Sequence, residues 1–273
     1  MGERDIPATG DCAQGRRGRS VRILLREHPE EARTLTDRSA RPPSRQDAHA
    51  PRFEAIPKPS GGVRWLTRLD PADLARYEAA VRPLVGGIER TLGPEVFAIR
   101  AGRWRQGWRV APWRPARRAW RRAVRTAVAG ARARTVFAVA DVAECYGSIS
   151  PEAVRAVLGS DADELVRLLA HLQDLGVRGL PIGPDPSAFV ANAVLARLDE
   201  TLRRAGVDHV RWVDDVIAWG APDDLRRALD RLVGSGEALG LALHDRKTRT
   251  LQDRDEAQSL TLGDRDSSII AAP

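Results

Sequence analysis

The sequence has very few cysteine and lysine residues. Its two cysteines, Cys12 and Cys145, lie far apart in unlike surroundings, which argues against a disulfide framework and against a cysteine zinc site. No apolar run approaches the roughly 18 residues that a membrane-spanning helix needs, and the N-terminus lacks the apolar core of a signal peptide. We therefore expect a cytoplasmic protein with no membrane partner, and neither a secreted scaffold nor a zinc finger.

Lysine is almost absent although the chain is basic. Of 44 Lys and Arg residues, only Lys58 and Lys247 are lysines, and the net charge is +7. A lysine differs from an arginine in its compact ammonium group, whose pKa can shift in a protein. Each of the two is therefore a candidate for a chemical role, although chance would explain either one alone.

Length and composition indicate a globular chain. With 273 residues, 42% of them hydrophobic, it can bury a core in one or two domains. Residues 1–50 predict a basic, mostly disordered arm, residues 51–251 the main domain, and residues 252–273 a polar C-terminal tail. In the main domain we expect strands over 63–69 and 135–141, a strand–turn–strand over 209–220, a strand pair over 241–251, and helices over 71–84, 116–128, 151–158, 162–175, 187–204 and 222–239.

One segment concentrates the positive charge. From residue 96 to 140 there are twelve arginines, four tryptophans and no acidic residue. Apolar residues recur there with helical spacing, and five arginines are assigned to the opposite face of that predicted helix: Arg117, Arg118, Arg121, Arg122 and Arg125. A solvated cationic surface is one interpretation. Five close arginines repel one another unless a polyanion is near, so we predict that this face binds nucleic acid.

Two adjacent carboxylates interrupt an apolar stretch near the C-terminal end. Asp214 and Asp215 lie between the predicted strands of residues 209–220. A plain turn is possible, but Asp-Asp without Gly or Asn is a poor hairpin signal. Adjacent like charges are unfavourable without a compensating cation, so the pattern favours a metal site.

A third carboxylate, Asp141, ends the apolar strand predicted over residues 135–141. Taken alone, it is either a helix cap or a ligand. Together with Asp214 and Asp215 it provides carboxylate oxygens for hard divalent cations. Magnesium uses few protein carboxylates and leaves room for substrate phosphates, as in two-metal phosphoryl transfer.

The order of these motifs resembles the reverse transcriptase domain, from Ile56 to Thr250. Residues 56–64 (IPKPSGGVR) resemble the fingers hairpin of bacterial and intron-type members, and residues 141–149 resemble the first catalytic motif. Residues 179–184 with Ser187 and Asn192 are similar to the loop and helix that contact template and nucleotide. Residues 212–215 (WVDD) are similar to the Tyr-x-Asp-Asp box, and residues 243–248 to the later lysine motif.

The resemblance implies roles for individual residues at the reacting phosphates. Lys58 and Arg64 would grip the incoming triphosphate. Asp141, Asp214 and Asp215 would hold two Mg²⁺ ions, for which Mn²⁺ can substitute, and Val142 would add its main-chain carbonyl. Lys247 would be the general acid for the leaving pyrophosphate.

Further implied roles concern the nucleotide and the template. Tyr146 would block a ribose 2′-hydroxyl and so favour dNTPs. Contacts to nucleotide and template are implied for Pro181, Ile182, Gly183 and Ser187. Ile182 stands where many members have Gln, Trp212 replaces the usual Tyr, and no thumb domain is visible after the last motif, so a protein or RNA partner is a further expectation.

We therefore expect an α+β fold: the fingers and palm of a right-hand polymerase, with a ferredoxin-like βαββαβ palm built on an antiparallel sheet. The expected activity is RNA-directed DNA synthesis from a DNA or RNA primer on an RNA template, in a bacterial, uncharacterised or phage-defence group. Untemplated or protein-primed DNA synthesis is the alternative within the same class. A non-catalytic nucleic-acid-binding module is the alternative outside it, while a DNA-binding regulator would need a helix-turn-helix that is not visible.

Overall fold

The N-terminal part of the fold is a β-hairpin. The computed structural model describes residues 50–259 except 58–61, 105–106, 246 and 252. Strands β1 (Arg52–Pro57) and β2 (Val63–Arg68) pair antiparallel, with Pro57 opposite Val63. This is the hairpin that the sequence predicts. Its turn, with Lys58, lies outside the described residues, as does the predicted arm of residues 1–49.

Two short helices follow where one was expected. Helix α3 (Pro71–Val81) begins at the predicted cap, because the Asp70 carboxylate accepts a hydrogen bond from Ala72 N at 2.8 Å. The chain then turns at Pro83, which has no N–H to donate, and continues as α4 (Val85–Thr91). A second hairpin, β3 (Ala101–Trp104) and β4 (Gly107–Val110), was not predicted, since four-residue strands are too short to show a clear alternation.

The central sheet has four antiparallel strands in the order β6-β7-β5-β8. They are β5 (Val136–Asp141), β6 (Asp208–Trp212), β7 (Asp215–Gly220) and β8 (Arg249–Thr250). Helices join β5 to β6 and β7 to β8, which is the predicted βαββαβ connectivity. The strand pair expected over 241–251 reduces to β8 and an isolated bridge between Val142 and Leu243, because Lys247 N and Thr248 N both turn back onto His244 O.

The segment between β5 and β6 contains four α-helices, the last of which is central to the core. They are α6 (Cys145–Ser148), α7 (Pro151–Leu158), α8 (Asp163–Asp174) and α9 (Asp185–Arg204). Helix α9 has 14 of its 20 residues buried, and it packs against α3, α4, α7 and α10 (Pro222–Glu237). A helix buried nearly all round forms the centre of a core and is a stiff support for what it contacts.

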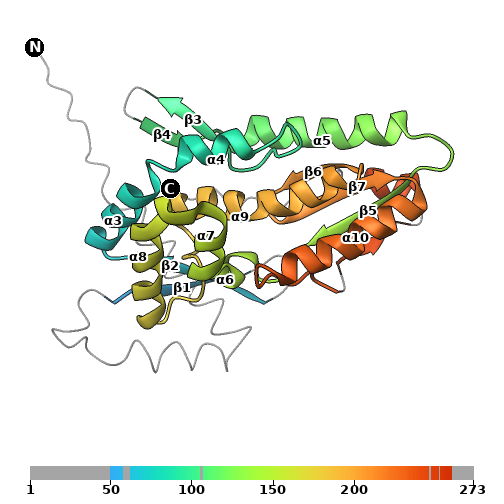
Figure 1. Ribbon diagram of the computed structural model, residues 1–273. Helices are drawn as coiled ribbons and strands as arrows, with labels where there is room; N and C mark the ends of the chain where they lie inside the picture. Colours follow the sequence, from blue (N-terminus) through green and yellow to red (C-terminus); the bar gives the residue numbers. More distant parts are fainter. Residues whose placement is uncertain (1–49, 58–61, 105–106, 246, 252, 260–273) are drawn as a thin grey trace, which may run out of the picture.

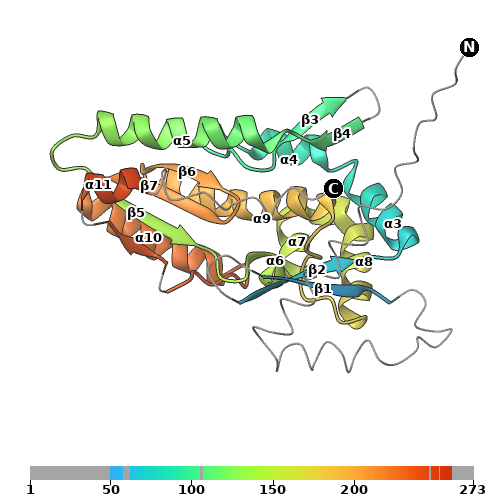
Figure 2. The same ribbon diagram turned by 180° about the vertical axis from the view of Figure 1, so that it is seen from behind.

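The two faces of the sheet carry separate apolar clusters. Ala138 and Val216 point toward the α9 and α10 side, whereas Phe137 and Ile217 pack with Trp120 from α5 (Trp113–Gly130). Figures 1 and 2 show α5 along one side of the sheet and α10 along the other. Helix α11 (Arg254–Ser259), in the segment predicted as a polar tail, joins the α5 side through the buried Ala257. Among the described helices, none combines the length and the apolar character needed to cross a bilayer.

Candidate active site

Asp141 and Asp215 lie directly opposite each other on neighbouring strands. Asp141 is the last residue of β5, Asp215 is the first residue of β7, and the two are register partners. Their side chains are close enough for Asp141 to raise the pKa of Asp215. Asp141 is not a helix cap, because the N-cap position of α6 belongs to Glu144. This leaves the ligand role as the remaining prediction for this carboxylate.

The turn between β6 and β7 consists of Val213 and Asp214. Trp212 pairs with Asp215 across it, so only two residues connect the strands. Val213 has φ +57°, a left-handed conformation that is unusual for a β-branched residue. Two-residue hairpins need positive φ at a central position, which normally selects Gly or Asn. Here that requirement is met by Val213, and the conformation is strained.

The carboxylates repel one another. Loss of hydration, the charge of Asp214 and that of Asp141 raise the pKa of Asp215 to about 7, although its side chain keeps an exposed edge. Burial and Asp141 also raise the pKa of Asp214. Lys247 and Arg64 oppose this effect on Asp214, which places both cations within electrostatic range of the acidic group. The three carboxylates thus carry more negative charge than Lys247 and Arg64 offset.

The donor atoms at this point fit a magnesium site. Among the described residues, no group of three or more carboxylate, histidine or cysteine side chains is arranged so that it could hold a metal ion by itself. Two contacting carboxylates, Asp141 and Asp215, are what Mg²⁺ commonly takes from a protein, with the remaining positions filled by water and substrate phosphates. Asp214 lies within electrostatic range of both.

The ammonium group of Lys247 forms an ion pair with the carboxylate of Asp141. Its Nζ atom is 3.1 Å from Oδ1 and 3.0 Å from Oδ2 of that carboxylate. Residues 242–244 run beside the end of β5, where Ala143 N donates to Ala242 O and His244 N donates to Asp141 O. These bonds flank Val142, whose side chain is buried, so only its main chain could face the site.

Tyr146 and the loop that follows α8 close one side of the site. Leu180 N donates to Tyr146 O at 2.8 Å. Gly179 has φ +61°, and a Cβ there would lie 2.3 Å from Tyr146 O, so this contact needs glycine. Arg64 and Asp214 both act on the Tyr146 hydroxyl, whose pKa burial raises far above its ordinary value. Tyr146 is therefore within electrostatic range of Asp214, and its role at the ribose stays a prediction.

Loop residues 181–183 are held against the first hairpin. Thr67 N donates to Ile182 O at 2.7 Å, and Gly183 packs on Thr67 O. Ser187 is fully buried, with its hydroxyl 2.6 Å from Pro181 O and 2.9 Å from the Tyr77 hydroxyl. The expectation that Ser187 contacts substrate is corrected, because its hydroxyl is used inside the protein to hold Pro181.

The sequence analysis assigned one arginine of α5, Arg117, to the wrong face of the helix. Arg117 is 7% exposed, and its guanidinium lies 4.3 Å from the Trp120 ring centroid and 4.8 Å from that of Trp212. It precedes Trp120 by three residues and Val124 by seven, so helical spacing itself puts it on the buried face. The prediction was wrong because a cation was assumed to face solvent. Burial and Arg121 lower its pKa to about 10, so it stays charged at neutral pH.

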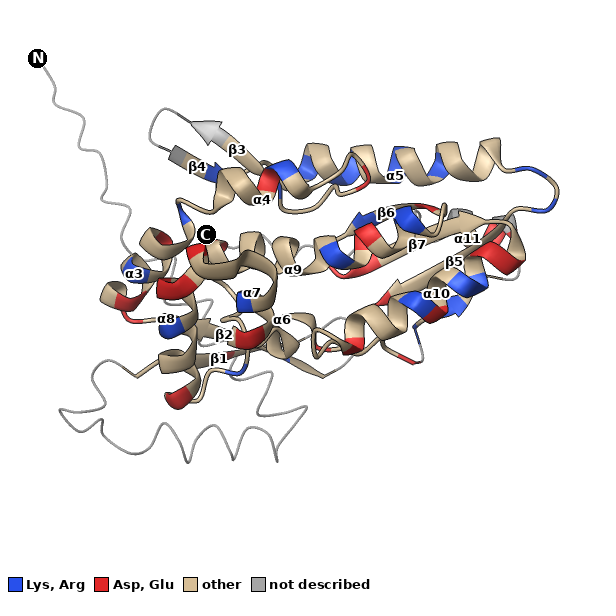
Figure 3. Cartoon of the chain, viewed as in Figure 1, with Lys and Arg blue, Asp and Glu red and all other residues tan. Residues whose placement is uncertain are grey.

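The other arginines keep an outward position. Arg118, Arg122 and Arg125 are exposed, and Arg121 is half-buried at the edge of the helix. In Figure 3 helix α5 carries basic bands and no acidic one. The predicted cationic face is thus present on the side of α5 that points away from the sheet, but it does not include Arg117.

A buried polar network under the Asp214 turn was not predicted. Arg211 is wholly buried and binds Asp199 and Asn192. Asn192, part of the segment that resembles the template- and nucleotide-contacting helix, is also buried, and its amide donates to Ala98 O and Ile99 O inside the protein. The available signal was Asp199, an acidic residue with helical spacing to the apolar residues of 187–204.

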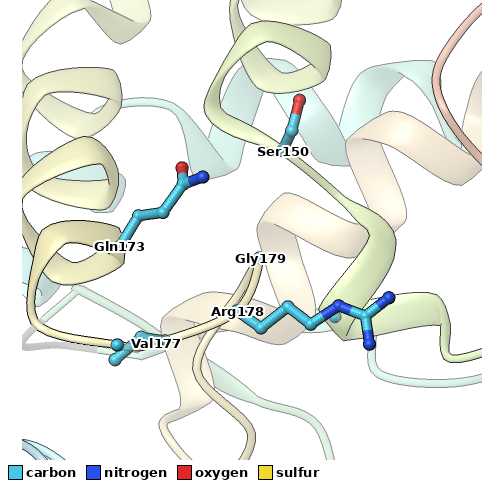
Figure 4. A pocket seen from close by; sticks show the side chains of 7 residues that line it. Ser150, Gln173, Val177, Arg178 and Gly179 are labelled. Atoms are coloured by element: carbon cyan, nitrogen blue, oxygen red, sulfur yellow. The ribbon is translucent and has the colours of Figure 1, made fainter.

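A cavity of about 380 Å³ lies behind the α6 turn. Its lining includes Ser150, Gln173, Arg178 and Gly179, and Figure 4 shows Gln173 extending toward Ser150 while Arg178 runs away from both. The Arg178 guanidinium forms an ion pair with Glu144 at 2.7 Å. None of the three aspartates lines this cavity, so the candidate active site is separate from it.

Comparison with known proteins identifies the fold. No family model and no curated protein matches the sequence. Telomerase from Candida albicans, in complex with a TWJ fragment of telomeric RNA, matches with a TM-score of 0.52 and 12% identity over 82% of this chain and 46% of that one. Apo telomerase from Candida tropicalis matches with a TM-score of 0.51 and 11% identity over 82% and 49%. The chain spans about half the length of these telomerase chains, and the likeness, with the sheet order above, confirms the predicted fingers and palm of a right-hand polymerase.

Proposed function

We propose that this chain is an RNA-directed DNA polymerase that adds dNTPs to a primer 3′-hydroxyl. One observation carries the proposal: β5 and β7 hold Asp141 and Asp215 in contact, with Asp214 and Lys247 beside them. A structural role would not place three mutually repelling carboxylates together at an accessible edge of a sheet. The telomerase likeness of the fold supports the same reaction class.

Each residue of the site has a task in this reaction. Asp141 and Asp215, with Asp214 and the Val142 carbonyl, would hold two Mg²⁺ ions, which lower the pKa of the attacking hydroxyl and offset the charge of the phosphates. Arg64 would bind the triphosphate, because it is the cation of β2 that acts on Asp214. We assign the same task to Lys58 from the sequence resemblance alone.

Lys247 would act on the leaving group. Its ammonium is already held at the carboxylate group and, near pyrophosphate, could donate a proton to the departing oxygen. Tyr146 would pack against the sugar of the incoming nucleotide and disfavour a 2′-hydroxyl. Residues 181–183 would contact template and base, and the exposed arginines of α5 would bind the phosphate backbone of the nucleic acid.

The test is incorporation of labelled dNTPs with Mg²⁺ on an annealed RNA-template and DNA-primer pair. Wild type is compared with Asp141→Asn and with Asp223→Asn, a matched change at an exposed aspartate of α10. Product that requires template and is lost only in Asp141→Asn supports the proposal. Product formed equally without template would instead show untemplated synthesis, and RNA binding without any product would show a binding module.

The setting of this activity is a separate part of the proposal. From the resemblance of residues 56–64 to the fingers hairpin of bacterial and intron-type members, some bacterial groups of which are tied to phage defence, we propose a role in phage defence. Expression of the wild-type chain should then lower phage plating efficiency on a sensitive host, and Asp141→Asn should not. Equal plating with both chains would overturn the defence role without touching the proposed chemistry.

A further inference from the structure

The side chain of Arg211, on β6, binds both the turn formed by Val213 and Asp214 and helix α9. Its side chain is fully buried, and Nε and Nη2 bind the Asp199 carboxylate at 2.8–3.0 Å. Nη1 donates to Asn192 Oδ1 at 2.9 Å and to Val213 O at 2.7 Å. The guanidinium therefore joins the stiffest helix of the core to the main chain of the residue that precedes Asp214.

Two hydrogen bonds of this network are made to residues whose backbone is strained. Ile99, Glu144 and Val213 are the non-glycine residues with positive φ in the described part of the chain. Arg211 binds the carbonyl of Val213, and Asn192 Nδ2 binds the carbonyl of Ile99 at 2.8 Å. A β-branched residue in the left-handed region persists only where its surroundings over-determine it, and these hydrogen bonds are such a restraint.

We propose that Asp199, Asn192 and Arg211 are positioning residues that keep Val213 in its left-handed conformation and thereby direct Asp214 and Asp215 toward Asp141. For its kinetic consequences the inference rests on the proposed function. The Asp199 carboxylate orients the Arg211 guanidinium, and Asn192 Oδ1 accepts a hydrogen bond from its Nη1 atom. The same Nη1 atom donates to the Val213 carbonyl and fixes its position. Without the hydrogen bond from Arg211 to Val213 O, the turn would relax, and the side chain of Asp215 would move away from Asp141 on β5.

An effect on the position of the Val213 turn can be separated experimentally from an effect on the stability of the fold. Replacing a buried ion pair by apolar residues of similar volume is often neutral for stability, whereas removing one partner leaves an uncompensated charge. The double variant Asp199→Leu/Arg211→Met should therefore fold while lacking the bond to Val213 O. Arg211→Lys is a milder second variant, because one ammonium keeps the charge pair but cannot also bind Asn192 and Val213.

Three measurements on the full-length chain test the inference. For the double variant, amide hydrogen exchange in a peptide covering 208–220 should quicken at least tenfold without metal. Binding of Mn²⁺ alone should weaken about tenfold, and kcat for nucleotide addition should fall about 100-fold, the scale of a 1 Å misplacement, while KM for dNTP changes less than threefold. Arg211→Lys should show smaller losses in the same order.

A matched control and a rescue complete the design. Glu89→Leu/Arg100→Met removes a partly buried ion pair, 2.8 Å long, that joins α4 to the start of β3 instead of to the Val213 turn, and should leave all three readouts within threefold of wild type. Adding Val213→Gly to the double variant should restore at least tenfold in kcat, because glycine adopts the left-handed conformation without strain.

The outcomes are decisive. Unchanged exchange and kcat in a folded double variant or in Arg211→Lys would overturn the inference, as would equal losses in the Glu89/Arg100 control or no rescue by Val213→Gly. An inactive wild type would count against the proposed polymerase alone, since hydrogen exchange still reports whether Arg211 restrains the turn.

Discussion

The ammonium of Lys247 straddles the carboxylate of Asp141, at 3.1 Å from Oδ1 and 3.0 Å from Oδ2, although 59% of the lysine side chain is exposed. Partial burial opposes its charge, but Asp141, with Asp215 and Asp214, raises the pKa of Lys247 above its ordinary value. One of the two lysines in the chain is thus held, charged, at the centre of the acidic group. An exposed lysine without a task would lose side-chain entropy for little gain in such a geometry.

We expect Lys247→Arg to lower kcat for nucleotide addition by about 100-fold, in the range of a lost general acid. Arginine keeps the positive charge but does not release a proton at neutral or mildly alkaline pH. Single-turnover incorporation between pH 6 and 10 measures the effect. Activity within threefold of wild type would mean that only the charge of Lys247 matters.

Metal-free protein should become less stable as the pH rises from 4 to 8. The pKa of Asp215 is about 7 in the folded chain against an ordinary 3.8, so in this window the folded state binds more protons than the unfolded one. The free energy of unfolding then falls with pH and levels off above 7. Urea unfolding with a chelator present checks this.

The matched variant for that titration is Asp215→Asn, which cannot ionise. It should be more stable than wild type at pH 8, and the difference should shrink toward pH 4. Two parallel stability curves would show that Asp215 does not carry the pH dependence.

Replacing Arg118, Arg122 and Arg125 of α5 by glutamine should weaken binding of single-stranded RNA and make it less salt-dependent. Three lost phosphate contacts lower the slope of log K against log salt by about 2. The control is the same charge change on α10, at the exposed Arg226, Arg227 and Arg231. Equal effects of the two triple variants would assign binding to net charge alone.

Arg117→Ala should destabilise the fold by about 2 kcal/mol, because the desolvated guanidinium lies close to both tryptophan rings. Its neighbour Arg118 is exposed, and Arg118→Ala should change stability by less than about 0.5 kcal/mol. Urea unfolding of the two variants compares them. Similar values would contradict the buried position of Arg117.

Gly179→Ala should displace the loop from Tyr146, since the added Cβ would lie 2.3 Å from Tyr146 O. Gly159 also has a positive φ, +67° with ψ −154°, but open space around it, so Gly159→Ala should cost about 1–3 kcal/mol of backbone strain without a steric clash. We expect nucleotide addition to fall at least tenfold in the first variant and little in the second. Measuring both activity and thermal unfolding separates the two effects.

Local patterns were sufficient for many elements. The Asp70-Pro71 pair predicted the start of α3, and the apolar run ending at Asp141 predicted β5. The two apolar strands around Asp214 and Asp215 were also predicted, but the turn lies one residue earlier, at Val213 and Asp214, and Asp215 is the first residue of β7. These features depend on residues close in the sequence, where capping, periodicity and turn chemistry act. The hairpin of β3 and β4 escaped because its strands are too short for such a signal.

The sequence by itself determined which residues share a strand, a helix face or a turn, and so it named the three aspartates and Lys247. The tertiary structure decided which cations become buried and which polar groups they meet. Arg117 is buried because Trp212, from β6, covers it, and Ser187 and Asn192 are turned inward by Pro181 and Arg211. Such pairs join residues that no local pattern relates, because a buried charge or hydroxyl is stabilised only by the particular partner that the folded chain brings to it.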